Sequence, residues 1–287
     1  MLTRQRKKHI LATLQRDGQV VAKTLSETLG LSEDTIRRDL RELAAEGLLQ
    51  RVHGGALPLA PAEADFAGRQ QLATGDKLAI GRAAARMVRP GQVVFIDGGT
   101  TAVQMARHLP AALRATVVTH SPSVALELVG HAGVEVVLIG GRLFKHSVVA
   151  VGAAAMEAIA RIRADTFFMG VTGVQADAGL TTADLEEAHI KRALMGAAAE
   201  TVVLASSEKI GAASACVIQP LGASVTLLVA ASAPPKPLTA LRKTSTRSSS
   251  EPICGLSGDT LRTCSSCVSA FSSSSRNFAM PCNWIAL

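Results

Sequence analysis

The sequence predicts an α/β protein in which a small helical N-terminal domain precedes a larger domain built on a mostly parallel sheet. Its 287 residues suggest about two domains at roughly 150 residues each. Residues 1–57 show helical periodicity, whereas short Val/Ile/Leu runs alternate with Ala-rich helical runs from residue 76 onward. Such alternation is typical of a parallel sheet covered by helices on both faces.

Composition and charge exclude several classes of protein. Hydrophobic residues make up 48% and charged residues 18%, which indicates a buried core rather than disorder. Aromatic residues are only 3%, which disfavours a protein that stacks single-stranded bases, and the net charge of +7 permits a polyanionic partner. No apolar stretch approaches the roughly 20 residues that cross a bilayer, and the charged N-terminus has no signal-peptide core. Only Cys216 precedes residue 250, so we expect a cytoplasmic protein without membrane contact.

Three helices are expected in the first 57 residues. Gly18 and Gly30 are suitable stops for the first two, and Ser32 is a suitable N-cap for the third. The apolar side chains that would form one core recur at helical spacing: Ile10, Leu11 and Leu14, then Leu25 and Leu29, then Ile36, Leu40 and Leu43.

The second and third helices, joined by a tight glycine turn, indicate a helix-turn-helix. The third helix presents Thr35, Arg37 and Arg38 near its start, where a recognition helix meets base edges in the major groove. Residues 48–57 supply two short extended pieces and a Gly-rich turn, as a wing would. The alternative is a small helical cap whose arginines form a solvated face with acidic neighbours, namely Glu33, Asp39 and Glu42.

The runs SEDTIRRDL (32–40) and GLLQRVHGGA (47–56) resemble the winged helix-turn-helix of the DeoR family of bacterial transcription regulators. The resemblance covers nearly all of residues 1–57 and implies a double-stranded DNA operator as partner. The side chains expected at the DNA are Lys23, Ser32, Thr35, Arg37, Arg38, Arg41, Arg51 and His53.

Strand ends in the middle of the chain indicate an anion site. The run DGGTT (97–101) ends an apolar strand and opens a helix, so its backbone N–H groups could hold a phosphate, although a Gly-Gly turn can also be only a tight connection. Residues 119–121, 140–141 and 170–173 also end strands, where parallel sheets bind ligands. Nearby cations suit an anionic ligand or are surface charges: Arg142, Lys145 and Lys209. Glu187 and Lys191, at i and i+4, stabilise a helix without any ligand.

Residues 76–243 resemble the C-terminal effector domain of the same family, through pieces such as VVLIGGRL, GVTGVQADAGLTTADLEEAHIKRA and VVLASSEKIG. That domain is similar in fold to ribose-5-phosphate isomerase and CoA transferases, and the resemblance implies a bound phosphorylated sugar or related intermediate. The residues expected around it are Gly98, Gly99, Thr100, Thr101, Ser121, Gly140, Gly141, Asp184, Glu187, Lys191 and Lys209. The chain departs from the family pattern at three positions, where His120 replaces Asn, and Thr172 and Ser206 replace Asp.

Two further segments complete the predicted organisation. Residues 58–75, rich in Ala and Pro, are expected to be a linker, and residues 244–287 an atypical tail without a closing strand. The Ser-rich tail indicates either a frameshifted end or a disordered segment, and its Cys264-x-x-Cys267 pair is a weak zinc motif.

These observations predict a transcription regulator, most simply a repressor of a carbohydrate operon that a phosphorylated sugar relieves, and a homo-oligomer (dimer or tetramer). No catalytic residue, cofactor or metal is expected. One alternative is a sugar-phosphate isomerase with Asp97, Glu187 or His120 as general base. Another is a non-functional truncated regulator.

Overall fold

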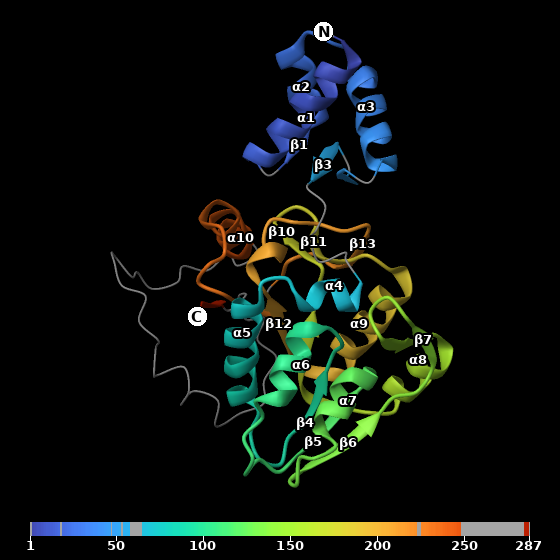
Figure 1. The fold of residues 1–287 in the computed structure, drawn as a ribbon, viewed down its shortest axis with the longest axis vertical. Coiled ribbons are helices and arrows are strands. Elements are labelled where there is room, and N and C mark those ends of the chain that lie inside the picture. The colour runs from blue at the N-terminus through green and yellow to red at the C-terminus, as the bar shows by residue number, and fades with distance from the viewer. Residues whose placement is uncertain are drawn as a thin grey trace, which may run out of the picture.

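The computed structural model describes residues 2–17, 19–46, 48–52, 54–57, 65–222, 225–247 and 284–286. Figure 1 shows a small helical head at one end of the molecule and a larger α/β domain at the other. We refer to residues 2–57 as the head and to the described residues from 65 onward as the α/β domain.

The head contains three helices and a small antiparallel sheet. Its helices are α1 (Thr3–Asp17), α2 (Ala22–Leu29) and α3 (Glu33–Ala45), and its strands are β1 (Val20–Val21), β2 (Gln50–Val52) and β3 (Gly55–Leu57), in the order β1-β3-β2. The three helices and the two-stranded wing confirm the prediction. The prediction was wrong at Val20 and Val21, because these β-branched residues pair with β3 before the second helix begins.

Local signals set the turn between α2 and α3. Gly30 ends α2 with φ +62, a left-handed conformation that glycine adopts without steric cost. The Ser32 hydroxyl accepts a hydrogen bond from Thr35 N at 3.3 Å and begins α3, as expected of an N-cap. Gly18, expected to end α1, lies outside the described residues. The apolar stripes of all three helices meet in one core that includes Ile10, Leu25, Ile36 and Leu40.

The α/β domain is built on a seven-stranded parallel sheet. Its strand order is β15-β14-β12-β9-β4-β5-β6. The strands are β4 (Val93–Ile96), β5 (Ala115–Thr119), β6 (Val134–Leu138), β9 (Ala164–Gly170), β12 (Ala198–Ala205), β14 (Val225–Val229) and β15 (Trp284–Ala286). The first six are the apolar runs predicted as strands, so the mostly parallel sheet is confirmed.

The tail differs from the expectation in two places. Helix α10 (Pro235–Arg247) continues past residue 243, and β15 pairs in parallel with β14, with Leu227 opposite Trp284. The prediction that no strand follows β14 was therefore wrong at residues 284–286. The weak zinc motif at Cys264 and Cys267 lies outside the described residues.

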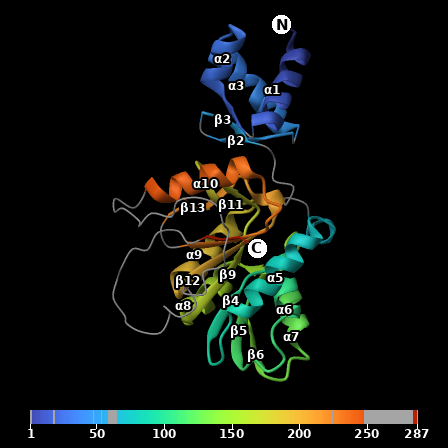
Figure 2. The same cartoon turned by 90° about the vertical axis from the view of Figure 1, so that its left-hand side faces the viewer.

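Helices cover both faces of this sheet, as Figure 2 shows. Helices α5 (Thr74–Met87), α6 (Thr100–Arg107) and α7 (Pro122–Leu128) enclose one apolar core, which includes Ile80, Met105 and Leu128. Helices α8 (Ala153–Ala160), α9 (Leu185–Ala197) and α10 enclose the other, which includes Phe95, Phe167 and Leu194. Strands buried on both sides explain why their sequences are continuous apolar runs.

Smaller elements, not predicted from the sequence, follow the carboxyl ends of the strands. A hairpin of β7 (Arg142–Phe144) and β8 (Val149–Val151) follows β6, and a second sheet pairs β10 (Gly173–Gln175), β11 (Gly179–Thr182) and β13 (Cys216–Gln219). Helix α4 (Phe66–Gln70) lies in the segment expected to be a linker, but it packs against α6, and Phe66 contacts the core beneath.

The chain changes direction across the sheet between β4 and β9. From β4 it proceeds through β5 to the β6 edge, and it then returns to β9 and continues outward through β12 and β14. Loops on the two sides of such a switch point diverge, which leaves a crevice at the carboxyl ends of the two strands. The fold thus predicts a ligand site beside residues 97–101 and 170–172.

Candidate functional site

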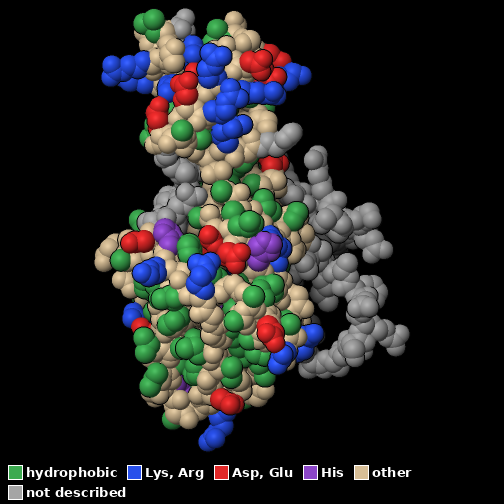
Figure 3. Space-filling view, turned by 90° about the vertical axis from the view of Figure 1, so that its right-hand side faces the viewer, with side chains coloured by type: hydrophobic (Ala, Val, Ile, Leu, Met, Phe, Trp, Pro, Cys, Tyr) green, Lys and Arg blue, Asp and Glu red, His purple; other side chains and the backbone are tan. Residues whose placement is uncertain are grey.

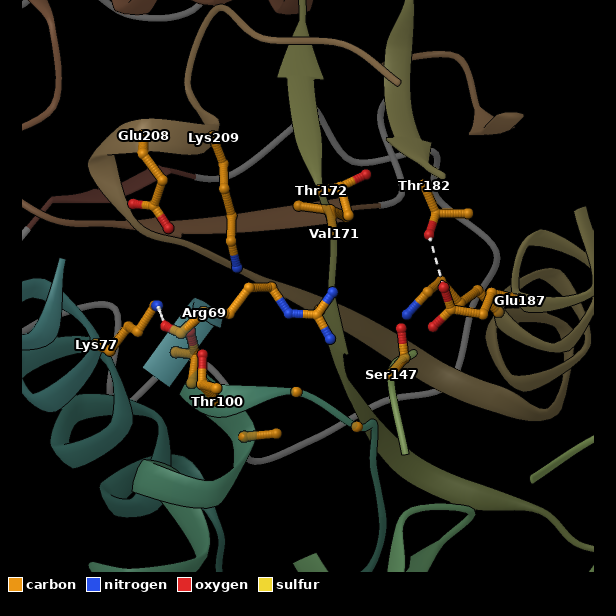
Figure 4. A pocket seen from close by; sticks show the side chains of 16 residues that line it. Arg69, Lys77, Thr100, Ser147, Val171, Thr172, Thr182, Glu187, Glu208 and Lys209 are labelled. Carbon is orange, nitrogen blue, oxygen red and sulfur yellow. Dashed lines mark hydrogen bonds between the residues drawn. The ribbon is translucent and has the colours of Figure 1, made fainter. Parts of the chain in front are cut away.

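A pocket occupies this crevice between β4 and β9. The loop after β4 lines it with residues 98–102, and the segment after β9 lines it with residues 170–172. The 3-10 helix η2 (Ser207–Lys209) contributes its last two residues and α9 contributes one face, and Figure 4 shows these side chains converging. The pocket therefore lies where this type of fold binds ligands.

The first wall of the pocket is the glycine loop that begins α6. Gly99 caps the helix at φ +103, a conformation that side chains rarely adopt. A Cβ on Gly98 would lie 2.2 Å from Val149 Cγ1, so this position also requires glycine. The first residues of α6 line the pocket, and their N–H groups have no acceptor within the helix and carry the positive end of the helix dipole. Such a terminus can bind an anion.

Thr101 carries a buried hydroxyl in the same loop. Its side chain is 3% exposed and lines the pocket, and among the described residues its Oγ1 has no hydrogen-bond partner. Because a buried polar atom without a partner costs free energy, this hydroxyl indicates a place for a ligand oxygen.

Four basic side chains enter the pocket from different elements: Arg69, Lys77, Lys191 and Lys209. Figure 4 shows Arg69 extending across the middle of the pocket, with Lys209 on one side and Glu187 on the other. Burial lowers the pKa of Lys209 to about 8, and the positive charges of Lys77, Arg69 and Lys191 contribute to this shift. An anion bound among these groups would offset the repulsion between their positive charges.

Beneath the pocket, Asp97 is fully buried and holds the neighbouring groups in place. It accepts hydrogen bonds from Lys191 Nζ, from Gly170 N at 2.8 Å and from His120 Nε2 at 2.7 Å. Burial alone would raise the pKa of Asp97, but the charge of Lys191 and the hydrogen bond from His120 outweigh it and lower that pKa. His120 Nδ1 lies 2.9 Å from Ala150 O, so both ring nitrogens face an acceptor.

Two carboxylates also line the pocket. Glu187 Oε2 accepts a hydrogen bond from Thr182 Oγ1 at 3.3 Å, and Glu208 Oε1 accepts one from Ser206 Oγ at 2.7 Å. The second oxygen of Glu208 is buried and has no partner among the described residues. Carboxylates accept hydrogen bonds from hydroxyl groups, so the pocket offers sites for a polyol beside its anion site.

The structure brings seven of the eleven predicted effector residues together in the pocket: Gly98, Gly99, Thr100, Thr101, Glu187, Lys191 and Lys209. The other four do not line it. Ser121 is buried behind Gly98, and Asp184 is the N-cap of α9, where it accepts from Glu187 N at 3.0 Å.

Gly140 and Gly141 lie outside the pocket because they follow β6. This strand forms the edge of the sheet, two strands away from the crevice. A Cβ on Gly141 would lie 2.8 Å from Val151 O, so this glycine permits the close approach of the β7–β8 hairpin. Arg142 and Lys145 are exposed and lie outside the pocket.

Nine lining residues were not among the predicted effector residues: Arg69, Lys77, Ala102, Ser147, Gly170, Val171, Thr172, Thr182 and Glu208. Thr172, one of the three departures from the family pattern, contacts Ser214 Oγ at 2.8 Å. The other two departures act behind the wall, because His120 binds Asp97 and Ser206 binds Glu208. Of the three bases that an isomerase could use, only Glu187 lines the pocket.

The head presents the predicted basic side chains on α3 and around it. Arg38 and Arg41 are exposed, and Arg37 is exposed but donates to Glu33 Oε1 at 2.8 Å. Lys23 and Arg51 are also exposed, Ser32 is at the exposed N-cap and Thr35 is half-buried, whereas His53 lies outside the described residues. Figure 3 shows Lys and Arg side chains gathered on the head.

Asp39 differs from the expected solvated face. It is 1% exposed and binds Arg6 of α1, with Arg6 Nη2 donating to Asp39 Oδ1 at 3.0 Å. This carboxylate fixes α3 against α1 and is not available to neutralise the exposed arginines. The basic surface of α3 can therefore meet phosphates and base edges.

Two other features bear on function, namely membrane-spanning helices and clusters of metal-binding side chains. No helix within the described ranges has both the length and the hydropathy to span a membrane. In the same ranges, no group of three or more His, Cys, Asp or Glu side chains could hold a metal ion.

Comparison with known proteins agrees with both halves of this description. A model of the "DeoR-like helix-turn-helix domain" matches residues 6–60, and one of the "DeoR C terminal sensor domain" matches residues 73–230. The chain is 37% identical to the HTH-type transcriptional regulator GlpR of Haloferax volcanii, over 74% of this chain and 83% of that protein. It is 31% identical to the glycerol-3-phosphate regulon repressor of Escherichia coli, over 72% and 82%.

Structural similarity adds little to these matches. The sorbitol operon regulator SorC of Klebsiella pneumoniae is 15% identical over 73% of this chain and 90% of that one, and its TM-score of 0.32 is too low to establish a shared fold. The sequence relatives are named as transcriptional regulators and not as enzymes, so the isomerase interpretation is not supported. Both family models match in the expected order, and the chain belongs to the DeoR family of transcriptional regulators.

Proposed function

We propose that the protein is a cytoplasmic repressor that binds an operator through α3 and releases it when a phosphorylated sugar enters the β4–β9 pocket. The main observation in favour of effector binding in this pocket is the buried hydroxyl of Thr101. It has no partner among the described residues and lies at the N-terminus of α6 among four basic side chains. The phosphate would bind the α6 N–H groups, and the sugar hydroxyls would bind Glu187 and Glu208.

The name of one relative supports this choice of ligand. It is the glycerol-3-phosphate regulon repressor of Escherichia coli. A phosphorylated polyol or sugar combines the dianion and the hydroxyls that the pocket would recognise.

An assembly of two or more copies is part of the proposal. A single head buries a small interface on DNA, and dimeric regulators gain affinity by binding two half-sites. The edge strand β6 carries exposed Val137 and Leu138, and the adjacent α7 carries exposed Leu126. Apolar side chains on an unpaired sheet edge suit an interface between copies.

The variant Thr101→Val tests whether the effector binds in this pocket. It keeps the shape of the side chain and removes a hydroxyl that has no partner among the described residues, so its thermal stability should equal or exceed that of the wild type. Its affinity for glycerol 3-phosphate, fructose 1-phosphate or glucose 6-phosphate should fall about tenfold in calorimetry. Gly140→Ala is the matched control: a Cβ there meets no atom within 4 Å, so binding should not change.

Two outcomes would contradict the proposed pocket. Equal binding by wild type and Thr101→Val would remove α6 from the ligand site. Weakened binding in Gly140→Ala would place the ligand near the β6 edge, outside the crevice.

A further inference from the structure

Arg69 reaches the pocket from the part of the chain nearest the head. It lies on α4, the first helix after the segment that follows wing strand β3. Its side chain is 8% exposed, and Figure 4 shows it crossing the centre of the pocket toward Ser147 and Glu187. Helix α4, the first helix after the DNA-binding head, thus places a charged side chain in the proposed effector pocket.

The pocket is too small for a sugar phosphate while Arg69 lies across it. Its cavity measures about 40 Å³, whereas small-molecule sites begin at roughly 300 Å³. A second cavity of about 290 Å³ lies against α4 and shares Lys77 and Thr100 with the first. Arg69 lines only the first of these cavities, so its movement would enlarge the first cavity beside the second.

Helix α4 is attached in a way that transmits such movement. Lys77 Nζ donates to the carbonyl oxygen of Arg69, and Phe66 N donates to His146 O at 2.9 Å. Phe66 and Gln70 line the second cavity, so α4 borders open space on that side, although Phe66 also contacts the core enclosed by α5, α6 and α7. A shift of Arg69 that moves its backbone would move the whole five-residue helix with it.

We infer that Arg69 binds the phosphate of the effector directly, and that its movement shifts α4 and so carries effector binding to the head. The inference rests on the proposed function. A guanidinium presents a planar pair of donors that matches two phosphate oxygens, which a lysine ammonium does not. Arg69 also lies close enough to Glu187 and Asp97 to sense their charges, so a dianion entering the pocket competes directly for its guanidinium.

The test separates the binding of the effector by Arg69 from the movement of α4 that follows binding. Arg69→Gln should weaken binding of glycerol 3-phosphate, fructose 1-phosphate or glucose 6-phosphate by about 10- to 100-fold, and Arg69→Lys by less, because lysine keeps the charge and loses only the paired donors. Arg82→Gln, which removes an exposed arginine from α5, should bind as the wild type does.

Hydrogen exchange provides the second measurement, because a merely structural role would not alter it in the same way. In the wild type at saturating sugar phosphate, exchange should change at amides 66–72 and at amides 99–102. In Arg69→Gln at saturation, it should change at 99–102 only. Arg69→Lys should restore part of the change at 66–72.

Each failure has a distinct meaning. If the wild type binds none of these sugar phosphates, the proposed sensor function fails and the inference fails with it. If the wild type binds and Arg69→Gln binds equally well, the inference alone is overturned. The inference is also overturned if sugar phosphate changes the hydrogen exchange of amides 66–72 as much in Arg69→Gln as in the wild type.

Discussion

His120 donates from Nε2 to Oδ1 of Asp97 at 2.7 Å, in a fully buried pair directly beneath the pocket. Lys191, which lines the pocket, binds the other oxygen of the same carboxylate. His120 and Lys191 are thus two side chains that donate to one carboxylate. The carboxylate thus organises the floor of the pocket, and its own contacts with a ligand are blocked by its partners.

Asp97→Asn should destabilise the protein by about 3–5 kcal/mol at pH 7, because it leaves the Lys191 ammonium buried without a counter-charge. The folded state lowers the pKa of Asp97, so its contribution is complete above the unfolded value of about 3.9 and is lost as pH falls toward the lower folded value. In urea unfolding, the difference between variant and wild type should therefore shrink below about pH 4.

Asp184→Asn is the control for this variant. Asp184 caps α9, and asparagine caps a helix about as well, so stability should change little. A loss in Asp184→Asn as large as that in Asp97→Asn would show that the buried pairing is not the cause. A difference that persists unchanged at pH 3 would contradict the assigned direction of the pKa shift.

Binding of a sugar phosphate should weaken at alkaline pH through Lys209. Its pKa is about 8, so it is mostly protonated at pH 7 and mostly neutral at pH 9, and its charged neighbours are Glu208, Lys77, Arg69 and Lys191. The phosphate is already a dianion in this range, because its second pKa is about 6. Affinity should therefore fall about tenfold from pH 7 to pH 9 in calorimetry.

Lys209→Gln should bind more weakly at pH 7 and lose most of this pH dependence. Lys77, whose pKa burial also lowers, accounts for any dependence that remains. An unchanged pH profile in Lys209→Gln would exclude Lys209 from the phosphate site.

Operator recognition should depend on Arg38 at the level of single base pairs. Arg38→Ala should cost about 1–3 kcal/mol and relax preference at one position if the side chain reads a base. If it binds only phosphate, the loss should be uniform across sequences and the salt dependence should become shallower. Arg37, which pairs with Glu33, should contribute less on its own.

Gel-shift assays on DNA that this protein selects from a random pool can measure these effects. Arg161→Ala, an exposed arginine on the α/β domain that pairs with Glu157 as Arg37 pairs with Glu33, should have no effect. Unchanged binding by the double variant Arg37→Ala/Arg38→Ala would reject α3 as the recognition helix.

The isolated head should bind the same DNA much more weakly than the full chain. Residues 2–57 contain their own apolar core, so the fragment should retain its helices in circular dichroism. Loss of the domain that would join two heads should reduce affinity at least about 100-fold. Equal affinity for the fragment and the full chain in fluorescence anisotropy would argue against paired heads.

The sequence predicts most of this architecture because its signals are local. Ser32 and Gly30 set the turn before α3, and the strand at residues 93–96 ends in Asp97 and two glycines that begin a helix. Such signals depend on caps, turns and periodicity within a few residues. They predict the glycine loop of the pocket and the recognition helix.

Strand order and long-range contacts are not local, and the errors come from there. Gly140 and Gly141 end a strand just as Gly98 and Gly99 do, but only the order of strands shows that β6 is an edge and that the crevice lies between β4 and β9. Arg69 lies in a stretch that resembles a linker and enters the pocket because α4 packs on α6. Asp39 looks like a surface charge until α1 brings Arg6 to it.

The most direct test of the account measures operator affinity with and without sugar phosphate, in the wild type and in Gly99→Val. Valine at φ +103 would deform the start of α6 and place a side chain in the pocket, outside the DNA-binding head. By fluorescence anisotropy, sugar phosphate should weaken operator binding at least about tenfold in the wild type, within the usual range of coupling between sites. Gly99→Val should bind the operator equally well alone and ignore the sugar phosphate. An operator affinity that no sugar phosphate alters in the wild type, or a normal response in Gly99→Val, would contradict the account.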